Sequence, residues 1–330
     1  MKQYAIAVLG SGAWGTALAI HLAKKMPVCL WGRAEDVPMQ MQSQRTNEKY
    51  LPNIPFPERL HVEPCLEKAL ADAEDILIAV PSHAFGSLLS QMKPFLILDT
   101  QKIVWATKGL DPKTHRLLHE VVKDILGPSC VFAVLSGPSF AREVAEGLPT
   151  AVSLASGSLP FLEKLVDLLH SEYFRTYTTY DYIGVQVCAV VKNVLAIAVG
   201  ISDGMHLGAN ARAALITRGL AEMTRLGLAM GGILQTFLGL AGVGDLVLTC
   251  TDNQSRNRRF GLALGGAPDL AKDADPKTIE GKMNAEEVYL LAKVHHVEMP
   301  ITERVHAILT GTETPEEAMR ILLSRPVVGV

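Results

Sequence analysis

Residues 4–23 read YAIAVLGSGAWGTALAIHLA. An apolar run is followed by a glycine-rich turn over residues 10–15 and then by a segment with the apolar spacing of a helix. In such a strand–turn–helix context, Gly10 makes the tight turn, Gly12 lets a pyrophosphate approach the backbone, and Gly15 lets the helix pack closely on the strand. The pattern alone is weak evidence, and the alternative is an ordinary strand–helix turn. Its context favours a dinucleotide-binding site.

Length and composition indicate a globular protein of about two domains. The chain has 330 residues, of which 48% are apolar and 20% charged. The net charge of −3 gives no reason to expect nucleic acid or an anionic membrane as a partner. A phosphate ligand would therefore have to be bound by a few local cations.

The cysteines and the first residues indicate the compartment. Five cysteines are scattered along the chain without C-x-x-C spacing: Cys29, Cys65, Cys130, Cys188 and Cys250. An odd number without a pattern argues against a disulfide framework and a zinc site, and favours a reducing compartment. Residues 1–3 run directly into the first strand, so no signal peptide fits. We expect a cytoplasmic protein.

The most apolar long segment covers residues 183–201. It contains Gln186, Lys192 and Asn193, and a membrane span seldom carries a lysine near its centre. We therefore expect a buried helix and no membrane insertion.

Further short apolar runs predict the other strands of an open sheet. They cover residues 27–31, 76–80, 102–106, 131–135 and 150–155, whereas the proline-rich residues 47–64 suit a surface loop. Polar clusters follow three of the runs, at residues 81–83, 107–109 and 136–139. Ligands of open α/β sheets bind outside the carboxyl ends of the strands, so these clusters indicate one binding crevice.

The pattern changes near residue 183, after which helical spacing dominates. Helices are predicted over residues 183–201, 210–229, 255–265, 284–296 and 301–310. The predicted fold class is α/β, with an N-terminal Rossmann-like doubly wound sheet and an all-α C-terminal domain. We expect a dinucleotide-binding domain over residues 1–185 and a helical substrate-binding and catalytic domain over residues 186–330.

Arg33 bears on the choice of cofactor. NAD-binding folds often place an acid at the end of the second strand to hold the ribose hydroxyls, whereas an arginine there can accept the 2′-phosphate of NADP. Here the acid is missing at the strand end and Arg33 is present, with Glu35 and Asp36 close behind. The arrangement favours NADPH without excluding NADH. The alternative is an exposed turn arginine.

Lys192 lies inside an apolar helical pattern. Burial of an ammonium is costly unless it is paired, and desolvation lowers the pKa of a lysine, which can make it an acid or base near neutral pH. The alternative is a snorkelling or structurally paired lysine.

Two further polar segments interrupt the helical half. Asp245 lies between glycines and an apolar run, where it either meets a partner or caps a helix. Residues 255–259 read SRNRR, and arginines with serine and asparagine donors at a helix start suit a phosphate. The alternative for that segment is a solvated basic turn.

Motifs occur in one consistent order along nearly the whole chain. They cover residues 10–15, 47–52, 79–82, 106–109 and 135–139 in the first half, and residues 191–193, 210–219, 242–245, 255–257, 280–281 and 299–303 in the second. With these motifs the chain resembles the bacterial NAD(P)-dependent sn-glycerol-3-phosphate dehydrogenase family, for which Leu-Ser-Gly-Pro-Ser and Ser-Arg-Asn are specific.

The resemblance implies an enzyme that reduces dihydroxyacetone phosphate reversibly to sn-glycerol 3-phosphate with NADP(H), NAD(H) or both, and without a metal, for glycerophospholipid synthesis. It makes Lys192 the catalytic general acid/base. Substrate contacts are implied at Lys108, Gly137, Ser139, Lys192, Asp245, Ser255, Arg256 and Asn257. Cofactor contacts are implied at Gly10, Gly12, Ala13, Trp14, Gly15, Arg33, Lys108, Ala141, Arg256, Thr278 and Glu280.

One segment departs from the family pattern. After Glu280-Gly281 the family usually shows a bulky residue and then arginine, whereas this chain has Lys282-Met283-Asn284. That departure puts the cofactor contacts of residues 278–284 in doubt. The resemblance and a mean hydropathy of +0.22 are compatible with a homodimer.

Two other functions fit parts of the sequence. Another two-domain hydroxyacid or hydroxyacyl dehydrogenase shares the predicted architecture but does not need the Ser-Arg-Asn segment. A non-catalytic NAD(P)-sensing protein would keep the glycine turn but has no need of Lys192 with Asp245.

Overall fold

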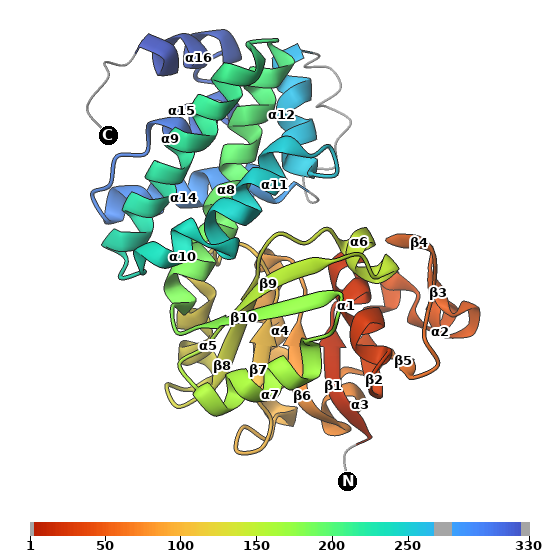
Figure 1. The fold of residues 1–330 in the computed structure, drawn as a ribbon. Coiled ribbons are helices and arrows are strands. Elements are labelled where there is room, and N and C mark those ends of the chain that lie inside the picture. Colours follow the sequence, from red (N-terminus) through yellow and green to blue (C-terminus); the bar gives the residue numbers. More distant parts are fainter. Residues whose placement is uncertain (1–2, 267–278, 325–330) are drawn as a thin grey trace. The chain divides into compact units, whose positions relative to one another are not determined.

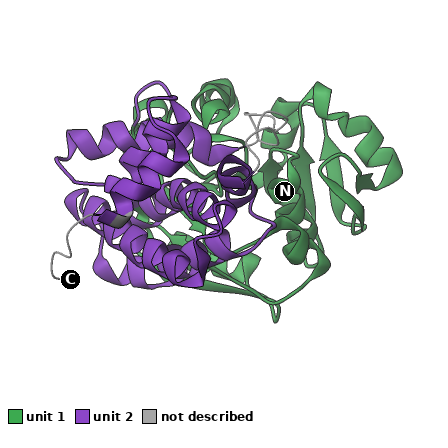
Figure 2. Cartoon of the chain, turned by 90° about the horizontal axis from the view of Figure 1, so that it is seen from above, with its two compact units in different colours: residues 1–111, 116–182 green, residues 112–115, 183–330 purple. Residues whose placement is uncertain are grey.

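The computed structural model describes residues 3–266 and 279–324. The chain forms two compact units, one of residues 1–111 and 116–182 and the other of residues 112–115 and 183–330 (Figure 2). The division falls between Tyr182 and Ile183, whereas the boundary predicted after residue 185 lies inside the helix α8 (Tyr182–Gly204).

The first unit is built on an eight-stranded sheet with the order β10-β9-β8-β7-β6-β1-β2-β5 (Figure 1). Its strands are β1 (Tyr4–Leu9), β2 (Val28–Trp31), β5 (Leu60–Glu63), β6 (Ala73–Ile78), β7 (Ile103–Trp105), β8 (Phe132–Ser136), β9 (Thr150–Ala155) and β10 (Phe174–Thr179). All neighbours pair in parallel except β8 and β9, which are antiparallel. The strand order reverses between β1 and β6, which is where open α/β sheets bind ligands.

Helices cover the sheet and bury its apolar strands. They are α1 (Ala13–Ala23), α2 (Pro38–Gln44), α3 (Leu66–Ala71), α4 (Ser82–Met92), α5 (Leu118–Leu126), α6 (Ala141–Glu146) and α7 (Leu159–Leu169), with short 3-10 turns η1 (Ala34–Asp36) and η2 (Lys93–Phe95). Helix α1 packs with α6 and α7, and α4 packs with α3 and α5. The central strands are buried on both sides, as doubly wound sheets require. The predicted doubly wound sheet is confirmed.

The prediction of a loop over residues 47–64 is wrong. The segment contains the hairpin β3 (Thr46–Asn47) and β4 (Leu51–Pro55) and then β5, which pairs with β2 at the edge of the main sheet. In β5 the residues Leu60 and Val62 are buried and alternate with half-buried ones, a pattern that the preceding prolines obscured. Strand β10 was not predicted either, because its polar sequence FRTYTT lies at the opposite edge.

Within the described residues of the second unit, all regular elements are helices, joined by turns (Figure 1). After α8 come α9 (Gly208–Ala229), α10 (Leu234–Leu238), a π-helical turn η3 (Leu240–Gly244), α11 (Asp245–Thr251), α12 (Arg256–Gly266), α14 (Glu280–Val294), α15 (Pro300–Leu309) and α16 (Pro315–Ser324). The five predicted helices are present, with ends that differ by several residues. The short α10 and α11 and the final α16 were not predicted.

Helix α8 forms the core of this unit. Within the described residues it is the one helix that is long and apolar enough to cross a membrane, but 94% of its most apolar window is buried by the protein. Such burial is typical of the central helix of a globular domain. The prediction of a buried helix over residues 183–201 is confirmed.

Glycines bring α8 and α12 into backbone contact. A Cβ on Gly200 would collide with the carbonyl oxygen of Arg258, and one on Gly261 would collide with that of Ile197. Asn193 precedes Ile197 by about one turn of α8, and Asn257 precedes Gly261 by about one turn of α12. This packing places Asn257 beside Asn193.

Candidate functional site

The glycine turn of the first unit has the geometry that its sequence predicts. Gly10 has φ +116°, and a Cβ there would lie 2.7 Å from the carbonyl oxygen of Ala79, just beyond β6. A Cβ on Gly15 would collide with the carbonyl oxygen of Gly10. At Gly12, by contrast, no heavy atom of the described chain lies within 4 Å of where a Cβ would be. The turn is therefore closed toward the sheet and open above Gly12.

The residues after Gly12 offer donors to a phosphate. Helix α1 starts at Ala13, and the first N–H groups of a helix have no acceptor inside it. The indole Nε1 of Trp14 is buried without a hydrogen-bond partner among the residues that the structure describes. The open space above Gly12 and the N–H groups at the start of α1 fit a dinucleotide pyrophosphate.

The end of β2 carries charges of both signs. Arg33, whose side chain is 61% exposed, lies 2.5 Å from Glu35 and 3.3 Å from Asp36. Asp36 also lies 3.7 Å from the Lys49 ammonium and accepts a hydrogen bond of 3.2 Å from the Tyr50 hydroxyl. A cation for a 2′-phosphate and a carboxylate for ribose hydroxyls thus stand at the same strand end.

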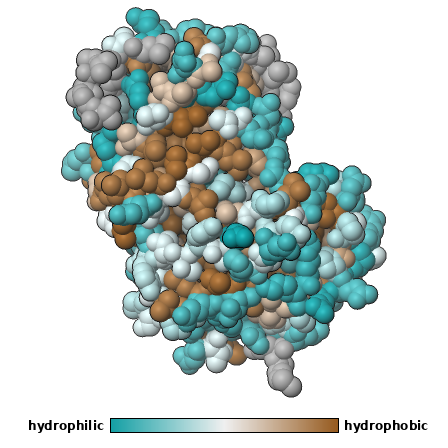
Figure 3. All heavy atoms as spheres, in the orientation of Figure 1, coloured by the Kyte–Doolittle hydropathy of each residue, from teal (hydrophilic) through white to brown (hydrophobic). Residues whose placement is uncertain are grey.

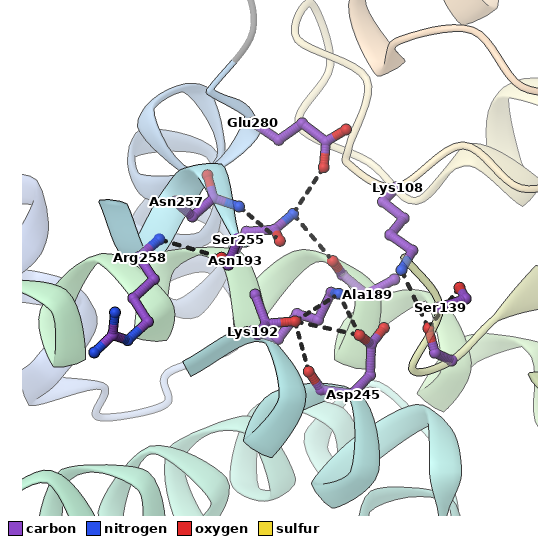
Figure 4. Close-up of polar contacts among 12 residues, drawn as sticks. Lys108, Ser139, Ala189, Lys192, Asn193, Asp245, Ser255, Asn257, Arg258 and Glu280 are labelled. Atoms are coloured by element: carbon purple, nitrogen blue, oxygen red, sulfur yellow. Dashed lines mark hydrogen bonds and ion pairs between the residues drawn. The ribbon is translucent and has the colours of Figure 1, made fainter. Parts of the chain in front are cut away.

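A second polar group of this unit follows β7 and β8. Lys108 Nζ and Ser139 Oγ both donate to the carbonyl oxygen of Gly137, at 3.4 and 3.1 Å (Figure 4). Gly137 has φ +143°, and a Cβ there would lie 3.1 Å from Val152 Cα, so the turn needs glycine. Ala141 begins α6, two residues after Ser139. The structure thus brings three predicted substrate residues together.

In the second unit Lys192 is buried and paired. Its ammonium lies 2.5 Å from Asp245 Oδ1 and donates to Thr249 Oγ1 at 3.0 Å (Figure 4). The three side chains are 5%, 1% and 5% exposed, so Lys192 does not snorkel. Two buried charges of opposite sign that are also hydrogen-bonded can stay ionised.

Two short elements place Asp245 and Thr249 against Lys192. The π-helical turn η3 ends at Gly244, which is the N-cap residue of α11, and Asp245 is the first residue inside that helix. The alternative of a helix cap is therefore wrong. Thr249 lies one helical turn later and donates to the carbonyl oxygen of Asp245 at 2.6 Å. Thr249 was missed in the sequence, where its i+4 spacing from Asp245 was the available signal.

A network of amides joins three helices next to Lys192. Asn257 donates to Asn193 Oδ1 at 3.0 Å and accepts from the N–H of Gly281 at 2.9 Å. Asn193 donates to Glu280 Oε2 at 3.2 Å (Figure 4). Arg256 lies 3.9 Å from Glu280 Oε1. Predicted substrate and cofactor residues of α12 and α14 are therefore connected through Asn193, a residue that was not predicted as part of the site.

The basic segment divides into an exposed and a buried part. The Arg256 side chain is 53% exposed, and Ser255 Oγ accepts from the N–H of Arg258 at 3.2 Å. Arg258 itself is buried; it donates to Cys250 O at 2.9 Å and to Asp203 at 2.7 Å. The alternative of a solvated basic turn is thus wrong for Arg258, which anchors the start of α12.

The departing segment lies on α14. Lys282 is exposed, whereas Asn284 is buried and donates to Glu287 at 3.0 Å. The predicted cofactor residue Thr278 lies outside the described residues. Within residues 3–266 and 279–324, no group of three or more His, Cys, Asp or Glu side chains is arranged to hold a metal ion.

Comparison with known proteins agrees with this geometry. The family model described as NAD-dependent glycerol-3-phosphate dehydrogenase N-terminus matches residues 5–161, and the corresponding C-terminus model matches residues 181–320. The protein named glycerol-3-phosphate dehydrogenase [NAD(P)+] of Colwellia psychrerythraea is 54% identical over 324 residues, with 97% of each chain covered. The one of Pseudoalteromonas translucida is 53% identical with the same coverage.

A solved structure extends the comparison. The crystal structure of glycerol-3-phosphate dehydrogenase from Coxiella burnetii is 53% identical and has a TM-score of 0.93, covering 98% of this chain and 99% of its own. Fold and relatives together define an NAD(P)-dependent dehydrogenase, an oxidoreductase. Within that class, the chain belongs to the NAD-dependent glycerol-3-phosphate dehydrogenase family, which confirms the predicted resemblance.

Proposed function

We propose that the chain catalyses the reversible NAD(P)H-dependent reduction of dihydroxyacetone phosphate to sn-glycerol 3-phosphate and so supplies glycerophospholipid synthesis. Relatives about as long as this chain bear the corresponding name at 53–54% identity. The observation that carries the proposal is the buried Lys192–Asp245 pair beside the amide network of Asn193 and Asn257. A sensor that only binds the cofactor has no use for such a pair.

The cofactor is assigned to the glycine turn. Gly10 and Gly15 shape the turn and Gly12 leaves room for the pyrophosphate, which the N–H groups of Ala13 and Trp14 would bind at the start of α1. The remaining assigned contacts are Arg33, Lys108, Ala141, Arg256, Thr278 and Glu280. When bound, the reduced nicotinamide supplies the hydride for C2 of the substrate. Arg33 favours NADPH, and the neighbouring carboxylates remain compatible with NADH.

The substrate phosphate is assigned to the start of α12. Arg256 offers an exposed guanidinium, and Ser255 and Asn257 add polar groups within the first helical turn. Lys108, Gly137 and Ser139 are assigned as further substrate contacts, and Lys108 would add positive charge near the ketone. Binding the phosphate at an exposed arginine fixes the position of C2 relative to Lys192.

Lys192 acts as general acid in the reductive direction. Its protonated Nζ polarises the ketone and donates a proton to the alkoxide that forms at the C2 oxygen. Asp245 and Thr249 hold Nζ by the hydrogen bonds of 2.5 and 3.0 Å and limit its rotamers. In the oxidative direction the neutral amine takes the same proton back from the C2 hydroxyl.

Three further assignments concern the roles of the domains, the compartment and the oligomeric state. We assign the dinucleotide-binding role to residues 1–185 and the substrate-binding and catalytic role to residues 186–330. The protein is expected in the cytoplasm.

Apolar residues gather on one face of the second unit in Figure 3, where α9 to α11 carry the exposed Leu228, Ile233, Leu234, Leu238 and Val247. Such exposure supports a homodimer, which sedimentation of Leu238→Asp beside the wild type would test.

Initial rates of NADPH and NADH oxidation with dihydroxyacetone phosphate test the reaction. Turnover is expected with the phosphorylated ketone, and a loss of at least about 100-fold in kcat/KM is expected with dihydroxyacetone, because a charge-assisted phosphate contact is lost. Equal rates with both ketones would contradict the role of the α12 segment. No turnover with either cofactor would contradict the proposed reaction.

A further inference from the structure

Asn47, which opens the motif at residues 47–52, has no role in the function described above. It lies in the β3–β4 hairpin, outside the main sheet, yet its side chain is only 2% exposed. Its amide Nδ2 donates to the carbonyl oxygen of Ser11 at 2.7 Å and to Thr16 Oγ1 at 2.8 Å. Its Oδ1 accepts from the N–H of Tyr50 at 3.3 Å. A side chain from the hairpin thus reaches the glycine turn and is fully hydrogen-bonded.

The bond to Ser11 fixes one peptide plane of the turn. In a trans peptide the C=O and the following N–H point in opposite directions. The Ser11 carbonyl points at Asn47 Nδ2 and also accepts from Thr16 Oγ1 at 3.2 Å. The N–H of Gly12 must therefore point away from Asn47, and it donates to no acceptor within the described chain. Gly12 is also the glycine of the turn at which an added Cβ would meet open space.

We propose that Asn47 is a positioning residue for the dinucleotide: it locks the Ser11–Gly12 peptide so that the Gly12 N–H is available to the pyrophosphate. The inference rests on the assignment of the cofactor to the glycine turn. In this role Asn47 acts through the backbone of the turn, by its hydrogen bond to Ser11 O. The motif at residues 47–52 thereby gains a function in cofactor affinity.

The chemistry of an amide suits this role. Asparagine brings two N–H donors and no charge, and both acceptors in reach, Ser11 O and Thr16 Oγ1, need a donor. A carboxylate of the same shape would keep the acceptor for Tyr50 but would donate nothing to Ser11 O. Asn47→Asp keeps the shape but removes the donors and adds a negative charge, whereas Asn47→Ala removes the donors and the packing without adding charge, so a raised Kd in both variants identifies the loss of donation.

The test is a direct titration of the full chain with NADPH in the absence of substrate, with calorimetry as the readout. We expect the Kd of Asn47→Ala and Asn47→Asp to rise about tenfold, the effect of one to two lost hydrogen bonds. The KM for dihydroxyacetone phosphate and kcat at saturating NADPH should stay within about twofold of wild type. A positioning role in cofactor binding predicts that split, whereas a general loss of structure would change all three constants.

The control is a second amide of the same unit. Gln42 on α2 accepts from the N–H of Val62 in β5 at 2.7 Å and makes no bond to the glycine turn. Gln42→Ala should bind NADPH within about twofold of wild type. Should the Asn47 variants fail to fold, Thr16→Val removes the other donor to Ser11 O and is expected to raise the Kd a few-fold.

Each outcome decides between two assignments. Wild-type affinity in folded Asn47→Asp would overturn the positioning role and leave the proposed reaction untouched. If the Asn47 variants do not fold, wild-type affinity in Thr16→Val would have the same consequence. A wild-type chain that turns over the substrate but does not bind NADPH alone would overturn the positioning role as well. A wild-type chain that neither binds NADPH nor turns over would overturn the cofactor assignment itself.

Discussion

The two polar sites of the molecule are built in opposite ways. The glycine turn of the first unit uses backbone: three glycines within six residues shape it, and its donors are N–H groups at the start of α1. The Lys192 site of the second unit uses side chains from α8 and α11, and Asp245 lies 53 positions from Lys192 in the sequence. The first site depends on local conformation, and the second depends on helix packing. Mutations should therefore separate binding of the cofactor from chemistry.

The largest expected effect comes from removing the ammonium. Lys192→Met should lower kcat by about 10³-fold, because general-acid catalysis contributes roughly 10² to 10⁴ in rate. The Kd of NADPH should stay within about twofold of wild type, since Lys192 is not among the assigned cofactor contacts and the glycine turn lies in the other unit. Rates and a NADPH titration measure both.

Asp245→Asn serves as the partner variant for this prediction, because it keeps the shape of the acceptor but removes its charge. It should lower kcat by less than Lys192→Met. Wild-type turnover in Lys192→Met would remove the lysine from the mechanism.

The next prediction tests whether the Lys192 site depends on the packing of α8 against α12. Gly200→Ala places a methyl group against the carbonyl oxygen of Arg258, where backbone cannot yield. Overpacking of this kind costs typically 1–3 kcal/mol and occasionally more. We expect Tm to fall by several degrees and kcat to fall with it, because α12 would shift.

The control is Gly157→Ala, where no heavy atom within the described chain lies within 4 Å of the added Cβ. It should leave Tm within about a degree of wild type. A Gly200→Ala protein as stable and active as wild type would show that the α8–α12 contact is not required.

A smaller effect concerns the pH dependence of the free energy of unfolding, through a carboxyl that accepts a hydrogen bond from the start of α15. Glu222 is buried and accepts from the N–H of Ile301 at 2.7 Å, and burial raises the pKa of its carboxyl to about 7. The folded state therefore holds this proton more tightly than the unfolded state between about pH 4.5 and 7. The free energy of unfolding falls as the pH rises through that window, by on the order of a few kcal/mol from this group.

Thermal unfolding at pH 5 and pH 8 measures this contribution. Glu222→Gln has no proton to lose, so its Tm relative to wild type should be higher at pH 8 than at pH 5. Glu317→Gln is the control without a pH effect in this range: hydrogen bonds from Thr314 lower the pKa of that carboxyl below 4.5, so its contribution is lost only at more acidic pH and the Tm of this variant relative to wild type should be the same at pH 5 and pH 8. A Tm difference between wild type and Glu222→Gln that does not change with pH would contradict the assignment.

The contrast between the sites also explains what the sequence could predict. The strand–turn–helix of residues 4–23 is encoded locally, so the glycine turn and the inner strands of the sheet were predicted correctly. Strands β5 and β10 lie at sheet edges, where prolines or polar residues mask the strand pattern. Their pairing depends on neighbouring strands that cannot be identified from the local sequence.

The helical site was predictable only in part. The pattern indicated that Lys192 and Asp245 need partners, but it did not show that they are partners of each other. Arg258 looked like one more exposed arginine of a basic segment, yet the close contact of α8 and α12 buries it against Asp203. Side chains that meet through helix packing cannot be paired from spacing alone.

The central claim is hydride transfer to C2 of dihydroxyacetone phosphate with proton donation by Lys192. The most direct measurement is NMR of the product formed by the wild-type chain from NADPH deuterated at the transferring position of C4. The account predicts sn-glycerol 3-phosphate with one deuterium, at C2. A product with deuterium elsewhere, or unlabelled glycerol 3-phosphate, would contradict it.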